Sequence, residues 1–213
     1  MPVLVLAGPN HGFDKSAAVI HETLQQAGIA ATLTDDKAIL TTPTLNSYDA
    51  LVFGTGFTRA TRQEDGTLKR EPDLTPEQEE GLFNFVAGGK GLVGMHGTAW
   101  WIGGRAVDLI GGHANWHPPG LTFTVNIADA THPTMQGIND FEVTDEIYIS
   151  AHEPTLQILA TAEWHNKAHP MAWVKQFGQG RVFYTTLGHT ADTFKQPAMG
   201  QMMVQAVRWV AGG

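Results

Sequence analysis

The chain contains no cysteine among its 213 residues. This absence excludes disulfide bonds, thiolate zinc sites and cysteine nucleophiles together. It leaves the redox compartment open, because a chain without cysteine tolerates either environment. Whatever chemistry the protein performs, a thiol side chain takes no part in it.

Positive charge is scarce as well. The chain has 13 Lys and Arg residues against 21 Asp and Glu residues, which gives a net charge of −8 at pH 7. No block of basic residues is longer than the pair Lys69 and Arg70. These features argue against nucleic acid or an anionic membrane surface as the main partner.

Long apolar runs and several familiar motifs are also missing. No run approaches 18 apolar residues, and the N-terminal residues lack the basic region of a signal peptide. We therefore expect a soluble, cytoplasmic protein. The sequence has no G-x-S-x-G nucleophile elbow, no phosphate-binding P-loop and no G-x-G-x-x-G after the first predicted strand. A serine elbow is therefore excluded, and nucleotide binding is not supported.

What the chain does have is enough apolar material for a sizeable core. Hydrophobic residues make up 42% of it, including six Trp and ten Phe. It contains no low-complexity linker and no internal repeat. We therefore expect one domain over residues 1–213.

The first half of the chain has the pattern of an α/β protein. Apolar runs at residues 3–7, 29–34, 50–54 and 92–95 predict buried strands. Asp14 is expected to cap a helix that Gly28 ends, and residues 75–78 (TPEQ) form the capping box of a second helix before Gly88 and Gly89. This order predicts a largely parallel sheet that is covered on both faces.

The second half is expected to add antiparallel strands and a last helix from about Pro197. The predicted strands are residues 121–127, 141–150, 156–164, 171–177 and 181–186. A hairpin at Gly178 to Gly180 joins the last two. Residues 55–74 show no periodicity, and a loop of this length is a lid, a binding element, a disordered segment or a solvated insertion.

Three histidines directly follow predicted strands: His11, His96 and His189. Carboxyl ends of parallel strands meet at one edge of a sheet, where ligands bind. His96 lies at a sharp turn between Gly94 and Gly97. An imidazole there can serve as a general base or a metal ligand, or it can simply hydrogen-bond to the backbone.

Other histidines and carboxylates are weaker candidates. His113 and His117 have the i, i+4 spacing of a helical metal site, but the glycines and prolines around them argue against a helix. His113 fits a pocket-lining loop, and His117 fits a structural role equally well. Glu146 offers a carboxylate beside an aromatic residue, and His132 before a proline indicates a turn rather than a ligand.

Six motifs in order resemble the ThuA-like (trehalose utilisation) family over nearly the whole chain. They are LTPEQ at 74–78, GLVGMH at 91–96, GGH at 111–113, HP at 132–133, DEIY at 145–148 and GRVFYTTLGH at 180–189. The resemblance implies an α/β fold similar to class I glutamine amidotransferases. That fold is a flavodoxin-like three-layer sandwich, mainly parallel with antiparallel additions in the C-terminal half. His96 would stand where amidotransferases keep their cysteine.

The resemblance also implies the site. Its catalytic candidates are His96, Glu146 and His189, which are equally candidate ligands for a divalent metal such as zinc. Thr190 follows His189, where a glutamate in a relative would add a carboxylate. The candidates for substrate binding are His11, His113, Trp100, Trp116 and Arg59, and Trp100, Trp101 and Trp116 can offer a sugar ring an apolar face.

The function implied is carbohydrate (trehalose or disaccharide) catabolism. We expect an enzyme that processes a sugar derivative, such as a keto-sugar made by a partner oxidoreductase, through histidine and glutamate acid-base or metal-assisted chemistry. One alternative is a non-catalytic sugar-binding or accessory module of an oxidoreductase. Another is a metal-dependent hydrolase of an unrelated small amide or ester. Whether the chain forms a homo-oligomer is left open.

Overall fold

The fold is described for residues 1–8, 12–54, 58–101 and 106–212 in a computed structural model. The strands are β1 (Pro2–Ala7), β2 (Ala30–Thr34), β3 (Ala50–Gly54), β4 (Thr58–Arg62), β5 (Leu68–Pro72), β6 (Gly91–Met95), β7 (Gly112–Trp116), β8 (Leu121–Ile127), β9 (Phe141–Asp145), β10 (Ile149–His152), β11 (Gln157–Trp164), β12 (Lys167–Phe177) and β13 (Gly180–Thr185). The α-helices are α1 (Phe13–Gln26), α2 (Pro76–Ala87), α3 (Ala106–Ile110), α4 (Ala191–Lys195) and α5 (Pro197–Val210). Short 3₁₀ helices are η2 (Lys37–Thr41), η3 (Pro43–Ser47) and η4 (His96–Trp100).

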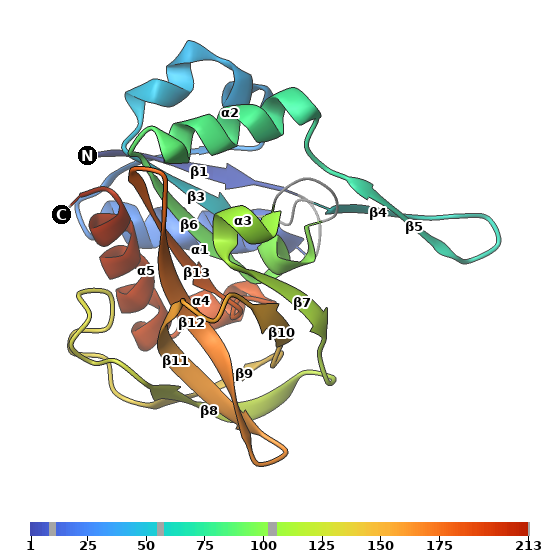
Figure 1. The fold of residues 1–213 in the computed structure, drawn as a ribbon, viewed down its shortest axis with the longest axis vertical. Helices are drawn as coiled ribbons and strands as arrows, with labels where there is room; N and C mark the ends of the chain where they lie inside the picture. Colours follow the sequence, from blue (N-terminus) through green and yellow to red (C-terminus); the bar gives the residue numbers. More distant parts are fainter. Residues whose placement is uncertain (9–11, 55–57, 102–105, 213) are drawn as a thin grey trace.

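A large mixed sheet passes through the centre of the molecule (Figure 1). Within the described ranges its strand order is β2-β1-β3-β6-β13-β12-β11-β8-β9. The strands from β2 to β13 in this order are parallel. Those from β12 to β9 are antiparallel to their neighbours. The predicted α/β class is confirmed, and half of the sheet is antiparallel.

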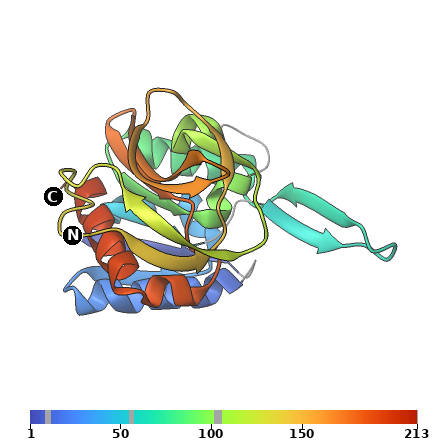
Figure 2. The same ribbon diagram turned by 90° about the horizontal axis from the view of Figure 1, so that it is seen from below.

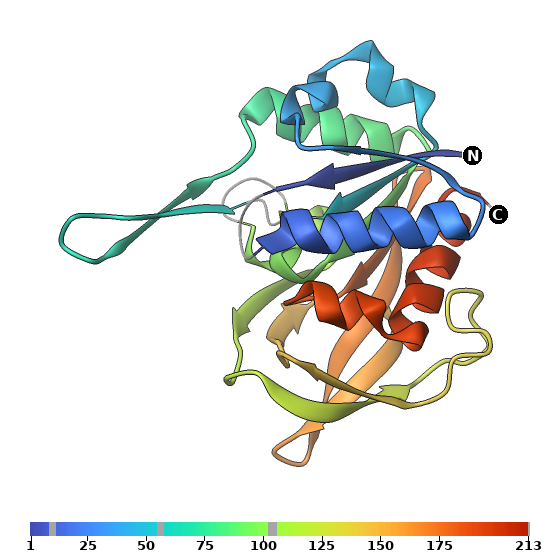
Figure 3. The same cartoon turned by 180° about the vertical axis from the view of Figure 1, so that it is seen from behind.

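Helices cover both faces of the sheet. α2 and α3 lie over one face (Figure 1), and α1, α4 and α5 lie over the other (Figure 3). Each face has its own hydrophobic core, with Leu4 and Leu6 in one and Val3 and Val5 in the other. Because β1 is buried on both sides, its sequence is a continuous apolar run rather than an alternating one.

Several local predictions are confirmed. Thr75 and Gln78 form the capping box of α2, with Gln78 N donating to Thr75 Oγ1 at 3.3 Å and Thr75 N to Gln78 Oε1 at 3.0 Å. Gly28, with φ of 76°, follows the end of α1 in the left-handed conformation that glycine adopts readily. α5 begins at Pro197, and β12 and β13 form the predicted hairpin.

Four local predictions are wrong. Asp14 does not cap α1, because the N-cap is Gly12 without a side-chain hydrogen bond. Residues 141–150 are not one strand, because β9 ends at Asp145 and β10 begins at Ile149. The predicted loop around His113 contains β7, which pairs with β10. Within residues 55–74 the described part, from residue 58 on, contains the antiparallel hairpin β4–β5 rather than a loop.

The hairpin β4–β5 extends away from the rest of the molecule (Figures 1 and 2). Almost all of its residues are exposed on both faces. With neither face buried, it shows no hydrophobic alternation, which is the pattern from which a strand is usually predicted.

None of the helices in the described part of the chain is long and apolar enough to cross a bilayer.

Two helical glycines give a paired prediction of stability. Gly81→Ala is expected to lower the free energy of unfolding by about 2 kcal/mol, because the added methyl group would collide with the carbonyl oxygen of Leu40. Gly200→Ala is the matched control in α5, where the nearest atom to a new methyl is Thr23 Cγ2 at 3.5 Å. It should stabilise by about 0.5–1 kcal/mol through helix propensity. Urea unfolding measures both, and equal effects would contradict the close packing of α2 on Leu40.

Candidate functional site

His96 lies at the carboxyl end of β6, where the strand turns into η4. Its side chain is 2% exposed, and its φ of 37° is left-handed. That conformation is uncommon for a residue other than glycine and often marks a functional position. The sharp turn predicted at this residue is confirmed.

Hydrogen bonds define which ring nitrogen of His96 faces the site. Nδ1 lies 2.7 Å from the carbonyl oxygen of Thr186, which can only accept, so Nδ1 carries a proton and donates. In the neutral ring Nε2 is then an acceptor, and the hydroxyl of Tyr148 donates to it at 2.7 Å. The tautomer therefore presents a lone pair on Nε2 to the groups around it.

Glu146 and His189 complete a cluster around that nitrogen. Nε2 of His96 lies 3.4 Å from Glu146 Oε2 and 3.3 Å from His189 Nδ1. His189 Nδ1 is also 3.3 Å from Glu146 Oε1. One ligand atom from each of the three residues lies within 4.8 Å of the others. The structure thus brings together two imidazoles and a carboxylate from three separate parts of the chain.

Asp145 holds two of these segments in place. Its buried carboxylate accepts from the backbone N–H of Glu146 at 2.7 Å, from Gly188 N at 2.9 Å and from His189 N at 3.3 Å. The hydroxyl of Thr193 on α4 donates to it at 2.6 Å. Because these bonds take the chain out of the sheet after β9, Glu146 lies at the site rather than in a continuing strand.

The charges in the cluster reinforce one another. Burial raises the pKa of Glu146, but hydrogen bonds from His189 and from His96 in its protonated form, together with the charges of the protonated rings, outweigh it and hold that pKa well below its usual range. The hydrogen bond with Glu146 raises the pKa of His189 despite its partial burial. Burial, with the nearby Tyr184 and Glu146, keeps the pKa of Tyr148 well above its ordinary value. Glu146 is therefore an anion, and Tyr148 is a neutral hydrogen-bond donor.

A cavity of about 430 Å³ opens over His96 and Glu146, and His189 is not among its lining residues. Its walls come from α1, the hairpin β4–β5, η4 and the segment after β9, and the lining residues are Phe13, Thr58, Ala60, Leu68, Arg70, His96, Gly97, Trp100, His117, Glu146 and Tyr148. Thr58 Oγ1 donates to the carbonyl oxygen of Trp100, which ties the base of the hairpin to η4. The volume lies in the range of small-molecule sites.

The remaining predicted residues take different places. Trp100 lines the cavity. The ring of His113 packs edge-on against the Trp100 ring, with the ring centroids 6.4 Å apart, but His113 is not among the lining residues. Trp116 is 54% exposed on β7. Arg59 pairs with Glu71 on the hairpin and does not line the cavity. His11 lies outside the described residues.

Two other predicted residues lie away from the site. Trp101 is buried against Phe83 of α2. His132 lies in the predicted turn, where its Nδ1 is 2.8 Å from Thr134 Oγ1. Neither residue lines the cavity.

Sequence reasoning missed three residues that belong to the site, Asp145, Tyr148 and Arg70, and it left the role of His117 open. His117 Nδ1 is 2.9 Å from Pro118 O and 3.5 Å from Glu146 Oε1. In the DEIY motif, Asp145 precedes Glu146 and Tyr148 follows two residues after it. If the strand predicted over residues 141–150 had been ended at this motif, both residues would have been expected at the site. No local signal distinguishes Arg70 from the other cations of the hairpin.

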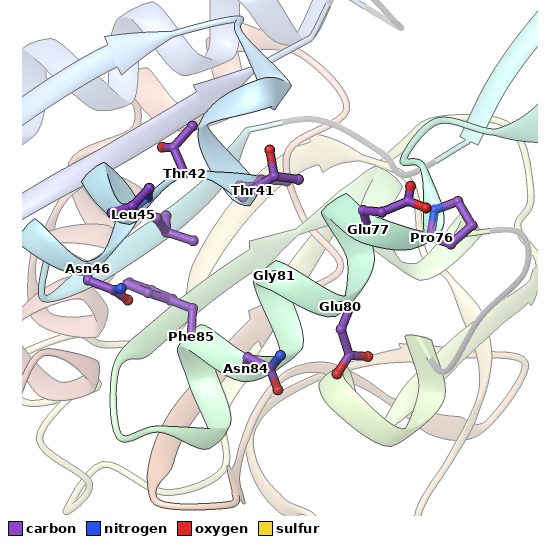
Figure 4. A pocket seen from close by; sticks show the side chains of 12 residues that line it. Thr41, Thr42, Leu45, Asn46, Pro76, Glu77, Glu80, Gly81, Asn84 and Phe85 are labelled. Atoms are coloured by element: carbon purple, nitrogen blue, oxygen red, sulfur yellow. The ribbon is translucent and has the colours of Figure 1, made fainter.

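A second, shallower hollow of about 720 Å³ lies between α2 and the η2–η3 segment (Figure 4). Its titratable side chains are Glu77 and Glu80, and no histidine is among the described residues that line it. Without an acid-base pair or a mixed set of metal ligands, this hollow offers less chemistry than the smaller cavity over His96.

Comparisons with known proteins agree on one family. The model of the ThuA family, described as trehalose utilisation, matches residues 2–210. A ThuA-like protein from Bacteroides uniformis superimposes with a TM-score of 0.78 at 15% identity, covering 99% of this chain and 91% of that one. One from Parabacteroides merdae gives 0.77 at 16%, covering 100% and 90%. Comparison with curated protein sequences gives no significant match.

The same fold also occurs as part of a larger enzyme. The β-galactosidase from Bacillus circulans sp. alkalophilus superimposes with a TM-score of 0.68 at 13% identity, covering 98% of this chain and 30% of that one. At such identities the structural likeness shows the fold alone.

Proposed function

The chain belongs to the ThuA (trehalose utilisation) family, and on that premise we propose that it is an enzyme of carbohydrate catabolism that processes a sugar derivative such as a keto-sugar. The cluster of His96, Glu146 and His189 carries the proposal, because two of its members, His96 and Glu146, line a 430 Å³ cavity. Trp100 and Tyr148 offer aromatic surface in the same cavity, which suits the apolar face of a sugar ring.

The cluster fits a divalent metal such as zinc. Its donor set of two imidazoles and one carboxylate is that of several catalytic zinc sites, which keep one position open for water or substrate. The hydrogen bond from His96 Nδ1 to Thr186 O orients the lone pair of Nε2, as outer-shell partners of zinc-bound histidines do, and zinc would replace the Tyr148 hydroxyl as the partner of that lone pair. His96, Glu146 and His189 would hold the ion, which would polarise a substrate carbonyl as a Lewis acid.

In the alternative without a metal, the chain's own side chains supply the acid and base groups. His96 Nε2 is the base, with its tautomer fixed by Thr186. His189, whose pKa is raised, is the acid. Tyr148 keeps its hydroxyl proton and can donate to an oxygen on which negative charge develops. Glu146 stabilises positive charge on either imidazole.

We also propose where the enzyme acts, what kind of substrate and partner it has, and how its sheet is arranged. A cytoplasmic location is supported by a structural neighbour from Salmonella typhimurium LT2 that is described as a cytoplasmic protein. The acidic net charge supports a small-molecule substrate rather than nucleic acid or a membrane. A sugar oxidoreductase would supply the keto-sugar. The parallel strand order β2-β1-β3-β6-β13 supports a flavodoxin-like arrangement within one domain.

Metal binding is the first test. Zinc is expected to bind the purified protein at one ion per chain, and His189→Ala should weaken it at least about tenfold, because a ligand is lost. Calorimetric titration measures both. The control is His113→Ala, which removes a histidine outside the cavity and should leave affinity unchanged.

Turnover is the second test. With and without zinc, the protein is given 3-keto-disaccharides, and product formation is followed. Turnover that depends on His189 supports the proposal, with or without a requirement for metal. Saturable sugar binding without turnover, together with co-purification of an oxidoreductase, would instead support the accessory module.

A further inference from the structure

The cavity over His96 carries charge of opposite sign on different walls. Glu146 is the acidic side chain among the lining residues, and Arg70, on strand β5 of the hairpin, is the basic one. Phe13, Trp100 and Tyr148 supply aromatic surface in the same cavity. A ligand therefore meets an anion in the histidine cluster, a cation on the hairpin and apolar rings within one space.

Strand alternation places two cations of the hairpin, Arg62 and Arg70, on the face toward the cavity, and Arg70 is the one among the lining residues. Arg70 pairs across the hairpin with Ala60, and both residues line the cavity. Arg59 pairs with Glu71, one position along each strand, which places both on the opposite face.

The other cations of the hairpin are held by acceptors of the chain itself. Arg59 Nη2 lies 3.5 Å and Lys69 Nζ 2.8 Å from the Glu71 carboxylate. Arg62 Nη1 donates to the carbonyl oxygen of Gly66 at 2.8 Å. Across the described ranges no acceptor lies within hydrogen-bond distance of the Arg70 guanidinium. The hairpin cation without an internal partner is thus the one that lines the cavity.

From this arrangement we infer that the substrate is a sugar derivative bearing an anionic group, a carboxylate or a phosphate, which Arg70 binds. The inference rests on the proposed function, whose substrate class it narrows. A guanidinium matches both anions with two parallel hydrogen bonds. Arg70 lies on the hairpin wall of the cavity, and His96 lies on the wall formed by η4, so the anionic end of the ligand is directed to Arg70 and the reacting end to the histidine.

Binding of three probes by titration calorimetry at low salt tests the inference. We expect D-glucuronate or D-glucose 6-phosphate to bind at least about tenfold more tightly than D-glucose. The tighter of the two identifies the anion. Arg70→Ala should abolish the difference, and Arg70→Lys should keep part of it.

Arg59→Ala is the matched control, because it removes the same charge from the opposite face of the hairpin. It should leave the preference for the anionic sugar intact. Equal binding of all three probes, no binding of any, equal losses in Arg70→Ala and Arg59→Ala, or inorganic phosphate binding as tightly as glucose 6-phosphate would each overturn the inference. The proposed function is judged separately, by zinc binding and turnover of neutral 3-keto-disaccharides.

Discussion

His96→Asn is expected to reduce turnover of a 3-keto-disaccharide by about a thousandfold. The Nε2 atom of His96 is the point on which Tyr148, Glu146 and His189 converge, at 2.7, 3.4 and 3.3 Å. Asparagine cannot place a basic nitrogen there. Because asparagine tolerates a left-handed backbone better than most residues, the substitution adds little strain at φ of 37°. Steady-state kinetics measures the loss.

The control for this substitution is His113→Asn. His113 packs against Trp100, which lines the cavity, but His113 itself does not line it, so its loss should leave turnover near the wild-type rate. The thermal unfolding midpoints of both variants show that each is folded. If His96→Asn were folded and turned over at the wild-type rate, His96 would have no part in the chemistry.

Asp145→Ala is expected to lower the free energy of unfolding by about 3–5 kcal/mol. The change leaves three backbone N–H groups and the Thr193 hydroxyl without their acceptor in a buried place. Since two of these groups belong to Glu146 and His189, zinc affinity should fall as well. Urea unfolding gives the stability, and calorimetry gives the zinc affinity.

Asp145→Asn keeps the side-chain shape and guards against a variant that fails to fold. It retains one acceptor oxygen, so its loss of stability should be smaller than that of alanine but in the same direction. Asp129→Asn is the less buried comparison: Asp129 also accepts several hydrogen bonds, from Thr131 and Gln157 among others, and these lower its pKa to about 2. Water can replace those bonds, so a loss as large as that at Asp145 would contradict the role of burial.

Local sequence patterns predicted an element correctly where its structure depends on residues that are close in the sequence. The capping box at Thr75 is a contact between neighbours in sequence, and the apolar runs of β1, β3 and β6 reflect burial on both faces. The pattern of the exposed hairpin could not be recognised, because without a buried face its two strands have no hydrophobic alternation. The continuous strand predicted over residues 141–150 failed for another reason. The strand ends at Asp145, whose carboxylate accepts a hydrogen bond from the backbone N–H of Gly188, 43 residues away.

The α/β class, the exclusion of thiol chemistry and the sharp turn at His96 could be predicted from the residues alone, because composition and short-range sterics decide each of these. Which side chains meet depends on how distant parts of the chain pack together. His96 Nδ1 is hydrogen-bonded to the carbonyl oxygen of Thr186, 90 residues away. The end of the strand at Asp145 brings Glu146 and Tyr148 to His96. Strand pairing alone separates Arg70, on the cavity face, from Arg59, on the other. Such placements depend on contacts between distant segments, which no local window contains.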